Sequence, residues 1–126
     1  MAGYSGTPLP RKIGIKDGDV VFLDHAPVTL ELRGTHARLP REFDVALTFH
    51  TSAAALARRL PQLLERMATA GMVWVCWPKK ASKVPTDLHD GLVRELGLSL
   101  GVVDVKVAAI DEVWSGLKFV RWLKDR

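Results

Sequence analysis

Residues 72–77, MVWVCW, form an apolar run without polar alternation, and this run most constrains the fold of the chain. A strand with one face in water alternates polar and apolar residues, whereas a strand covered on both faces does not. The run therefore predicts a central strand, which Pro78 and the charged residues after it end. Because helices usually cover both faces of such a sheet, the fold class is α/β.

A strand and a helix precede this run. Phe43–Phe49 predicts a buried strand, and Thr51 or Ser52 provides an N-cap for a helix after it. Apolar residues then recur at helical spacing as far as Met67. Pro61 lacks the backbone donor that a continuous helix uses, so we expect a kink or two short helices there.

A second helix follows the central strand. We expect Gly71 to end the first helix, Thr86 to cap the second, and Gly101 to end the second. The apolar face of the second helix consists of leucines spaced four residues apart: Leu88, Leu92, Leu96 and Leu100. Two strand–helix units predict parallel strands joined by right-handed crossovers.

Other short segments complete the expected sheet. Asp19–Leu23 predicts a further core strand, and the alternating segment Val28–Leu32 predicts a strand at an edge. Val103–Val107 also alternates, residues 111–116 predict a turn, and Leu117–Leu123 predicts a last strand antiparallel to its predecessor. The expected architecture is a small open sheet, mostly parallel, with a C-terminal antiparallel hairpin.

Length and composition indicate one domain. The chain has 126 residues, 48% of them hydrophobic, which is enough for one core. We expect a single α/β domain over residues 1–126, in which residues 1–18 lead into the sheet with one helical turn near Leu9–Ile13. A lone cysteine, Cys76, forms no internal disulfide, and no apolar run approaches the roughly 20 residues that span a bilayer. We therefore expect a cytoplasmic protein that does not contact membranes.

A basic loop follows the central strand. Lys79, Lys80 and Lys83 lie between that strand and the helix that Thr86 is expected to cap. The free N–H groups of a helix N-terminus, together with ammonium groups and the Ser82 hydroxyl, favour a phosphate, carboxylate or sulfate. We predict an anion site there, and the alternative is a solvated basic loop. The net charge of +4 is a weak indication of anionic partners, either a small molecule or a nucleic acid.

Polar residues also follow the other expected strands. Ligands of open α/β sheets gather at the carboxyl ends of the strands, where Asp24, His25 and His50 are expected to lie. If the strand before residues 111–116 is parallel to the others, Asp111 and Glu112 lie at the same edge. These two carboxylates are either a general acid/base pair or turn residues that cap and solubilise.

Trp114 and Lys118 are expected to flank the anion site. Trp114 would offer a stacking face to a ligand, unless it packs in the core. The sequence contains neither a serine in a nucleophile elbow nor a glycine-rich phosphate loop, which excludes two enzyme classes. His25 and His50 lie too far apart in sequence for a local metal-ligand pattern, so we predict no metal site.

The run FDVALTFHTSAAALARRLPQLLERMATAGMVWVCWP, Phe43–Pro78, resembles the later half of a class I S-adenosylmethionine-dependent methyltransferase. The resemblance implies a Rossmann-like, methyltransferase-like sheet in which the amino-acid end of the cofactor lies against a glycine-rich turn after the first strand. The matching turn here, Leu23–Pro27, contains no glycine, so the close backbone approach is not provided. We expect no cofactor, and a truncated methyltransferase-like fold rather than a working enzyme.

Four motifs distributed along the chain carry a second resemblance. YSGTP and KIGIK near the N-terminus, then WPKKASKVPTDL and IDEVWSGLKFV, together resemble a family of small bacterial proteins that share a domain of unknown function. This resemblance spans nearly the whole chain, and it leaves the activity open.

Three functions follow from these observations. The leading prediction is a non-enzymatic binding or regulatory module that recognises an anionic ligand through the basic loop. The first alternative is a small transferase-like enzyme acting on a phosphorylated or carboxylated substrate, with Asp111 or Glu112 as base. The second is an interaction protein that forms a homodimer through the Leu117–Leu123 edge hairpin, where Phe119 and Trp122 lie on opposite faces.

Overall fold

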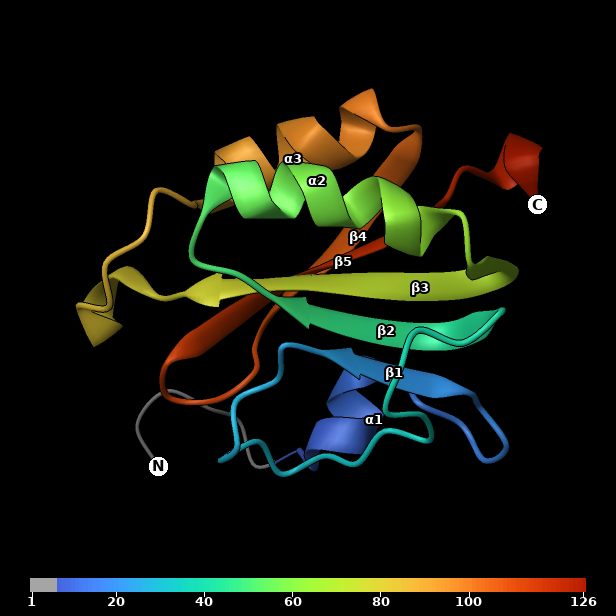
Figure 1. The fold of residues 1–126 in the computed structure, drawn as a ribbon, viewed down its shortest axis with the longest axis horizontal. Coiled ribbons are helices and arrows are strands. Elements are labelled where there is room, and N and C mark those ends of the chain that lie inside the picture. The colour runs from blue at the N-terminus through green and yellow to red at the C-terminus, as the bar shows by residue number, and fades with distance from the viewer. Residues whose placement is uncertain (1–6) are drawn as a thin grey trace.

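The structure, a computed structural model, describes residues 7–126. Residues 1–6, with the first part of the expected lead-in segment and of the YSGTP motif, lie outside the described residues. Within residues 7–126 the chain forms one five-stranded sheet in the order β1-β2-β3-β5-β4 (Figure 1). The strands are β1 (Val21–Asp24), β2 (Phe43–Phe49), β3 (Met67–Pro78), β4 (Val102–Ala109) and β5 (Trp114–Arg121). β1, β2 and β3 are parallel, and β5 is antiparallel to both β3 and β4.

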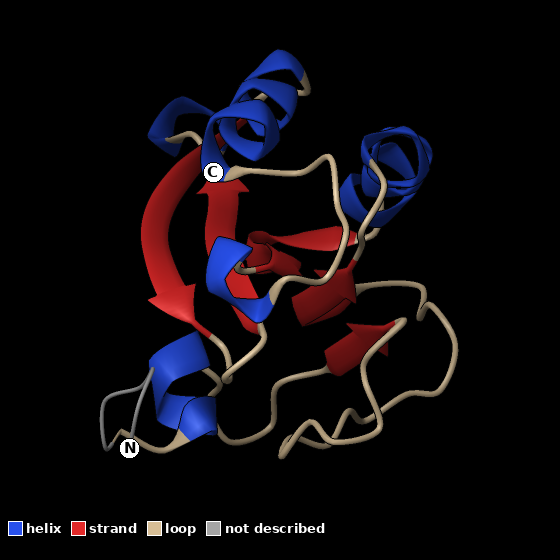
Figure 2. Cartoon of the chain, turned by 90° about the vertical axis from the view of Figure 1, so that its left-hand side faces the viewer, coloured by secondary structure: helices blue, strands red, loops and turns tan. Residues whose placement is uncertain are grey.

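Helices cover both faces of the sheet. α2 (Ala53–Leu64) and α3 (Asp90–Ser99) lie on one face, and the short α1 (Leu9–Ile13) lies on the other (Figures 1 and 2). Two single 3₁₀ turns, η1 (Lys80–Ser82) and η2 (Leu123–Asp125), complete the described elements. The predicted fold class is confirmed: a mostly parallel open α/β sheet with a C-terminal antiparallel hairpin.

The central strand divides the core into two apolar layers. Leu56, Leu60 and Leu63 of α2 pack on the layer beneath α2 and α3, which includes Val73 of β3. The opposite layer contains Trp74, whose indole Nε1 donates a hydrogen bond of 3.1 Å to the Ile13 carbonyl of α1. Neighbouring residues of β3 are therefore buried on opposite faces, as the apolar run predicted.

The α2–β3 connection differs from the expectation. Of the two alternatives for Pro61, two short helices are excluded, because α2 is a single helix that includes Pro61. The expectation for Gly71 is wrong, because Gly71 lies inside β3 rather than at the end of the helix. The reason is an irregular register, in which Phe43 pairs with Met67 while Val45 pairs with Met72, so that β3 accommodates extra residues between the two pairs. A Cβ at position 71 would lie 3.0 Å from the carbonyl oxygen of Ala68 in β3 and 3.0 Å from that of Asp44 in β2. This close approach explains why the residue is a glycine.

The edges of the sheet also differ from the expectation. Val28–Leu32 is not a strand, and the segment that returns to β1 instead contributes Thr35, whose backbone N–H donates to the Val21 carbonyl at 2.8 Å. The hairpin prediction is confirmed, but β5 pairs on both sides and β4 is the outer strand. The open edge of the hairpin is therefore β4 and not Leu117–Leu123, because β3 and β4 occupy both edges of β5, and a homodimer through this hairpin stays a prediction.

Candidate functional site

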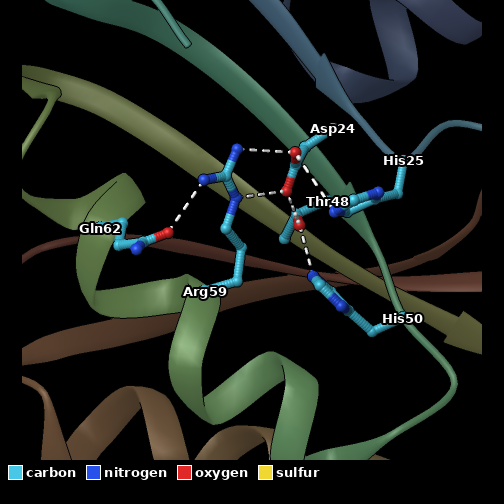
Figure 3. Close-up of polar contacts among 6 residues, drawn as sticks. All are labelled: Asp24, His25, Thr48, His50, Arg59 and Gln62. Carbon is cyan, nitrogen blue, oxygen red and sulfur yellow. Dashed lines mark hydrogen bonds and ion pairs between the residues drawn. The ribbon is translucent and has the colours of Figure 1, made fainter. Parts of the chain in front are cut away.

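The carboxyl ends of β1 and β2 bring four polar residues together. Asp24 ends β1 directly opposite Thr48 of β2, and His25 and His50 follow these two positions (Figure 3). The serine at position 52 caps the next helix by accepting from the Ala55 N–H at 3.2 Å, which turns α2 back across the sheet. This path carries Arg59 and Gln62 of α2 to the same strand ends (Figure 3).

Asp24 and Arg59 form a bidentate ion pair. Arg59 donates from Nε to Oδ2 and from Nη2 to Oδ1 of Asp24, each at 2.9 Å, and the side chain of Asp24 is only 5% exposed. Burial raises the pKa of Asp24, but hydrogen bonds from Arg59 and Thr48 outweigh burial and bring the pKa below its ordinary value of 3.8. The same hydrogen bond raises the pKa of Arg59. Both groups are therefore charged near neutral pH, and each neutralises the other.

A hydrogen-bonded chain connects this ion pair to His50. The Thr48 hydroxyl donates to Asp24 Oδ2 at 2.7 Å and lies 2.6 Å from His50 Nε2. The hydroxyl has one proton, which it gives to the carboxylate, so His50 donates from Nε2 to the Thr48 oxygen. Neutral His50 is then the Nε2–H tautomer, and its Nδ1 forms no hydrogen bond with residues 7–126. Burial is the main reason that the pKa of His50 lies below 6.5, with Asp24 opposing the shift and His25 and Arg59 adding to it.

A cavity of about 350 Å³ opens above this chain of groups. Its lining is mostly polar and cationic, and it consists of His25, His50, Ala55, Arg58, Arg59 and Gln62; we call this cavity the His50 cleft. His25 is exposed at a left-handed φ of 58°, and its ring meets the His50 ring edge to face at 5.7 Å between centroids. Arg59 also donates from Nη1 to Gln62 Oε1 at 2.9 Å, so its guanidinium is fixed on two sides.

Sequence reasoning found only part of this cleft. Asp24, His25 and His50 were expected at the strand ends, but Thr48, Arg59 and Gln62 were not predicted as site residues. Thr48 lies within a buried strand, and Arg59 lies on a helix where an arginine ordinarily faces water. The register of β1 with β2 brings Thr48 to Asp24, and the path of α2 brings Arg59 there; no local sequence pattern shows either contact.

The basic loop after β3 is built differently from the expectation. α3 begins at Asp90 with His89 as its N-cap, so Thr86 does not cap the helix. Thr86 instead donates to the Thr51 carbonyl at 2.7 Å and accepts from the Leu88 N–H, which fastens the loop to the start of α2. The unpaired N–H groups that were expected next to the lysines therefore belong to the first turn of α3, which begins at Asp90 and not directly after Thr86.

The lysine side of that loop forms a compact turn. Ser82 donates to the Lys79 carbonyl at 2.6 Å, and Lys83 follows η1 at a φ of 62°. Lys80 and Lys83 are exposed, and the Lys79 N–H donates to the Val113 carbonyl at 2.7 Å, so the turn before β5 lies beside this loop. An anion site at these lysines stays a prediction.

The remaining predicted residues fall into three different environments. Asp111 accepts from the Val113 and Trp114 N–H groups at 2.8 Å each and so shapes the turn, whereas Glu112 is exposed. Trp114 packs edge to face on Phe49 at 5.2 Å. Lys118 lies about 13 Å further along β5 than Trp114, at roughly 3.3 Å per residue, and the expectation that both residues flank one anion site stays a prediction.

Across residues 7–126, no three histidine, cysteine, aspartate or glutamate side chains are grouped so that they could hold a metal ion. The helices in this range are all too short or too polar to cross a membrane.

Solved structures share the fold of this chain at low sequence identity. Magnesium protoporphyrin IX methyltransferase (ChlM) from Synechocystis PCC 6803, with bound SAH, superposes with a TM-score of 0.50 at 10% identity, over 68% of this chain and 47% of that protein. LepI in complex with SAM superposes with a TM-score of 0.51 at 14% identity, over 90% of this chain and 39% of LepI. The chain thus spans less than half the length of either protein.

These comparisons correct one prediction and leave another unconfirmed. No protein-family model and no curated protein matches the sequence, so the resemblance to a family with a domain of unknown function is not confirmed. The methyltransferase-like fold is confirmed by the two superpositions. The expectation that the chain is more likely not an enzyme is contradicted by the same comparison, because the two structures that share its fold are a methyltransferase and a protein in complex with SAM.

Proposed function

We propose that the chain is a transferase-like enzyme that binds a phosphorylated or carboxylated substrate in the His50 cleft. One observation carries this proposal: His50, Thr48, Asp24 and Arg59 form a continuous hydrogen-bonded chain that makes His50 a neutral acceptor in a cation-lined cavity. The fold shared with a methyltransferase supports an enzyme, and the charge of the cleft supports an anionic substrate.

Arg58 and His25 are the groups that would bind the anion. Arg59 uses Nε and Nη2 for Asp24 and Nη1 for Gln62, so its role is to position Asp24. Arg58 lines the same cavity, is exposed, and makes no hydrogen bond or ion pair with residues 7–126. A guanidinium with free donors can bind a phosphate or carboxylate in bidentate fashion.

His50 is the group that would move a proton. Its Nε2–H is held by Thr48, so Nδ1 can accept a proton from a hydroxyl or amine of the substrate. Such deprotonation is the step that an acceptor substrate needs before it attacks a group donor. Asp24 stabilises the imidazolium that forms, because its carboxylate is connected to His50 through Thr48.

S-adenosylmethionine does not fit the corresponding turn of this chain. Residues 25–27, which follow β1, contain no glycine, and His25 occupies the left-handed conformation that glycine adopts at least cost. The Asp24 carboxylate already accepts from Arg59 and Thr48 and is almost fully buried. The turn thus offers neither a bare backbone nor a free carboxylate, and the proposed reaction contains no step through this cofactor.

A ligand screen with matched variants tests the proposal. The purified protein is heated with phosphorylated and carboxylated small molecules, and with SAM and SAH, because a ligand at about 100 times its Kd stabilises the fold by roughly 2.7 kcal/mol. Arg58→Gln should weaken binding of a hit by about tenfold or more. Arg41→Gln removes an exposed arginine just before the amino end of β2, whereas the cleft lies at the carboxyl end, so this substitution should leave binding unchanged.

Turnover separates an enzyme from a binding protein. Each hit is incubated with the protein and a set of group donors, and conversion is followed by mass spectrometry. His50→Gln should keep substrate binding and abolish conversion. Equal loss of binding in Arg58→Gln and Arg41→Gln, or unchanged conversion by His50→Gln, would refute the proposal.

A further inference from the structure

Two lysines face each other across the C-terminal hairpin. Lys106 of β4 and Lys118 of β5 are direct partners in the antiparallel ladder, and their side chains share the face of the sheet that carries α1. Like charges directly opposite one another destabilise a strand pair. This pair therefore lowers the stability of the hairpin unless a negative charge lies between the two ammonium groups.

The short helix α1 brings more basic residues to the same place. Lys106 Nζ donates to the Lys12 carbonyl at 3.1 Å, and Lys12 Nζ donates to the Ala109 carbonyl at 3.0 Å, so the end of α1 and β4 are fastened together. A Cβ at Gly14 would lie 3.6 Å from Lys118 Nζ, which places this ammonium directly beneath the turn after α1. Lys12, Lys16, Lys106 and Lys118 form what we call the lysine cluster.

The charges of Lys16, Lys106 and Lys118 are not compensated by ion pairs within the described part of the chain. Lys16, Lys106 and Lys118 form no salt bridge within residues 7–126, and the nearby Asp19 accepts from the backbone N–H of Lys16 at 2.9 Å. Lys118 is half-buried, and burial, followed by the charges of Lys106 and Lys16, lowers its pKa. A half-buried ammonium among other ammoniums is a costly arrangement that a bound anion would relieve.

We propose that the lysine cluster binds a phosphate-bearing small molecule, a diphosphate group in particular. Lys106 lies directly opposite Lys118 in the ladder, and the charge of Lys16 also acts on Lys118, so the arrangement suits a small anion of high charge. The glycine at position 14 adds no side chain beside this Nζ, where the Met72 thioether is the other neighbour. The site lies on the α1 face of the sheet, so it is separate from the His50 cleft and does not depend on the proposed function.

Calorimetric titration with inorganic pyrophosphate tests this site. The Arg58→Gln protein is used as background, so that the His50 cleft contributes little. We expect saturable binding of one pyrophosphate per chain, which weakens with added salt. Lys106→Gln and Lys118→Met, each in that background, should weaken the binding about tenfold or more, whereas Lys124→Gln, which removes an exposed lysine of η2, should not.

Thermal stability without ligand distinguishes a binding site from a merely structural role. Lys118→Met should melt at the same temperature as its parent or higher, because the substitution removes a desolvated and repelled charge. Should Lys118→Met fail to fold, Lys106→Gln decides the question, because Lys106 is exposed. The absence of saturable binding, equal weakening by Lys124→Gln, or binding of a short oligonucleotide through Lys118 without binding of pyrophosphate would overturn the proposal.

Discussion

The His50 cleft and the lysine cluster treat charge in opposite ways. In the cleft, Arg59 Nη2 lies 2.9 Å from Asp24 Oδ1, so the two charges neutralise each other. The Thr48 hydroxyl connects this ion pair to His50 by hydrogen bonds. In the cluster, Lys106 and Lys118 face each other without a carboxylate partner among residues 7–126. A network of paired charges thus stabilises the fold and fixes a side chain for chemistry. A group of unpaired charges stabilises the fold only when a ligand supplies the opposite charge.

The largest effect is expected from Asp24→Ala. The substitution leaves the Arg59 guanidinium partly buried without its carboxylate, and breaking such a pair should lower the free energy of unfolding by about 3 kcal/mol. Urea denaturation measures the loss. Asp104→Ala, which breaks the more exposed ion pair with Arg94, is the control and should cost much less. Similar losses in both variants would show that the Asp24 pair is not a special part of the fold.

Thr48→Val should have an intermediate effect. Valine keeps the shape of the buried side chain but removes the hydroxyl that joins His50 to Asp24, at a cost of about 1–2 kcal/mol. Because the hydroxyl helps to lower the pKa of Asp24, that pKa should rise in the variant, which carboxyl NMR titration detects. An unchanged pKa would mean that Arg59 alone determines the charge of Asp24.

The stability of the protein should depend on pH through His50. Above pH 6.5 His50 is neutral in the folded and the unfolded chain, so it contributes no pH dependence. Below pH 6.5 the unfolded chain takes up the proton first, because the folded pKa is lower, and stability falls until the folded pKa is passed. Denaturation curves of the wild type and His50→Gln should therefore diverge as the pH falls below 6.5. Parallel curves would show that burial does not affect His50.

The smallest effect is expected from Lys106→Glu. Glutamate opposite Lys118 replaces a repulsive cross-strand pair by an attractive one, which should raise the free energy of unfolding by less than about 1 kcal/mol. Lys124→Glu makes the same change of charge in η2 and should have no comparable effect. A loss of stability specific to Lys106→Glu would mean that its bond to the Lys12 carbonyl matters more than the repulsion.

Local patterns predicted the elements of this fold better than their ends. The apolar run of β3, the helical spacing of α2 and the C-terminal hairpin all follow from side-chain periodicity, which is a local property. Gly71 misled because a glycine is required where β2 and β3 change register, and Pro61 does not divide α2 into two helices. The cap at Thr86 was misplaced because its hydroxyl bonds to Thr51, a partner distant in sequence.

The site depended even more on contacts distant in sequence. The expectation of parallel strands predicted Asp24, His25 and His50 at the carboxyl ends of the strands. The ion pair with Arg59 and the lysine pair across β4 and β5 depend on the register and on where α2 crosses the sheet. The sequence shows these charges, but only the three-dimensional arrangement shows which of them are paired.

The tautomer and pKa of His50 test the central claim most directly. Long-range proton–nitrogen NMR correlations of the histidine rings, recorded over a pH titration, report both properties for His50. The hydrogen bond with Thr48 predicts the Nε2–H tautomer at neutral pH, and the burial of His50 predicts a pKa below 6.5. An Nδ1–H tautomer, or a pKa at or above 6.5, would contradict the claim that Thr48 and burial hold His50 as a neutral proton acceptor.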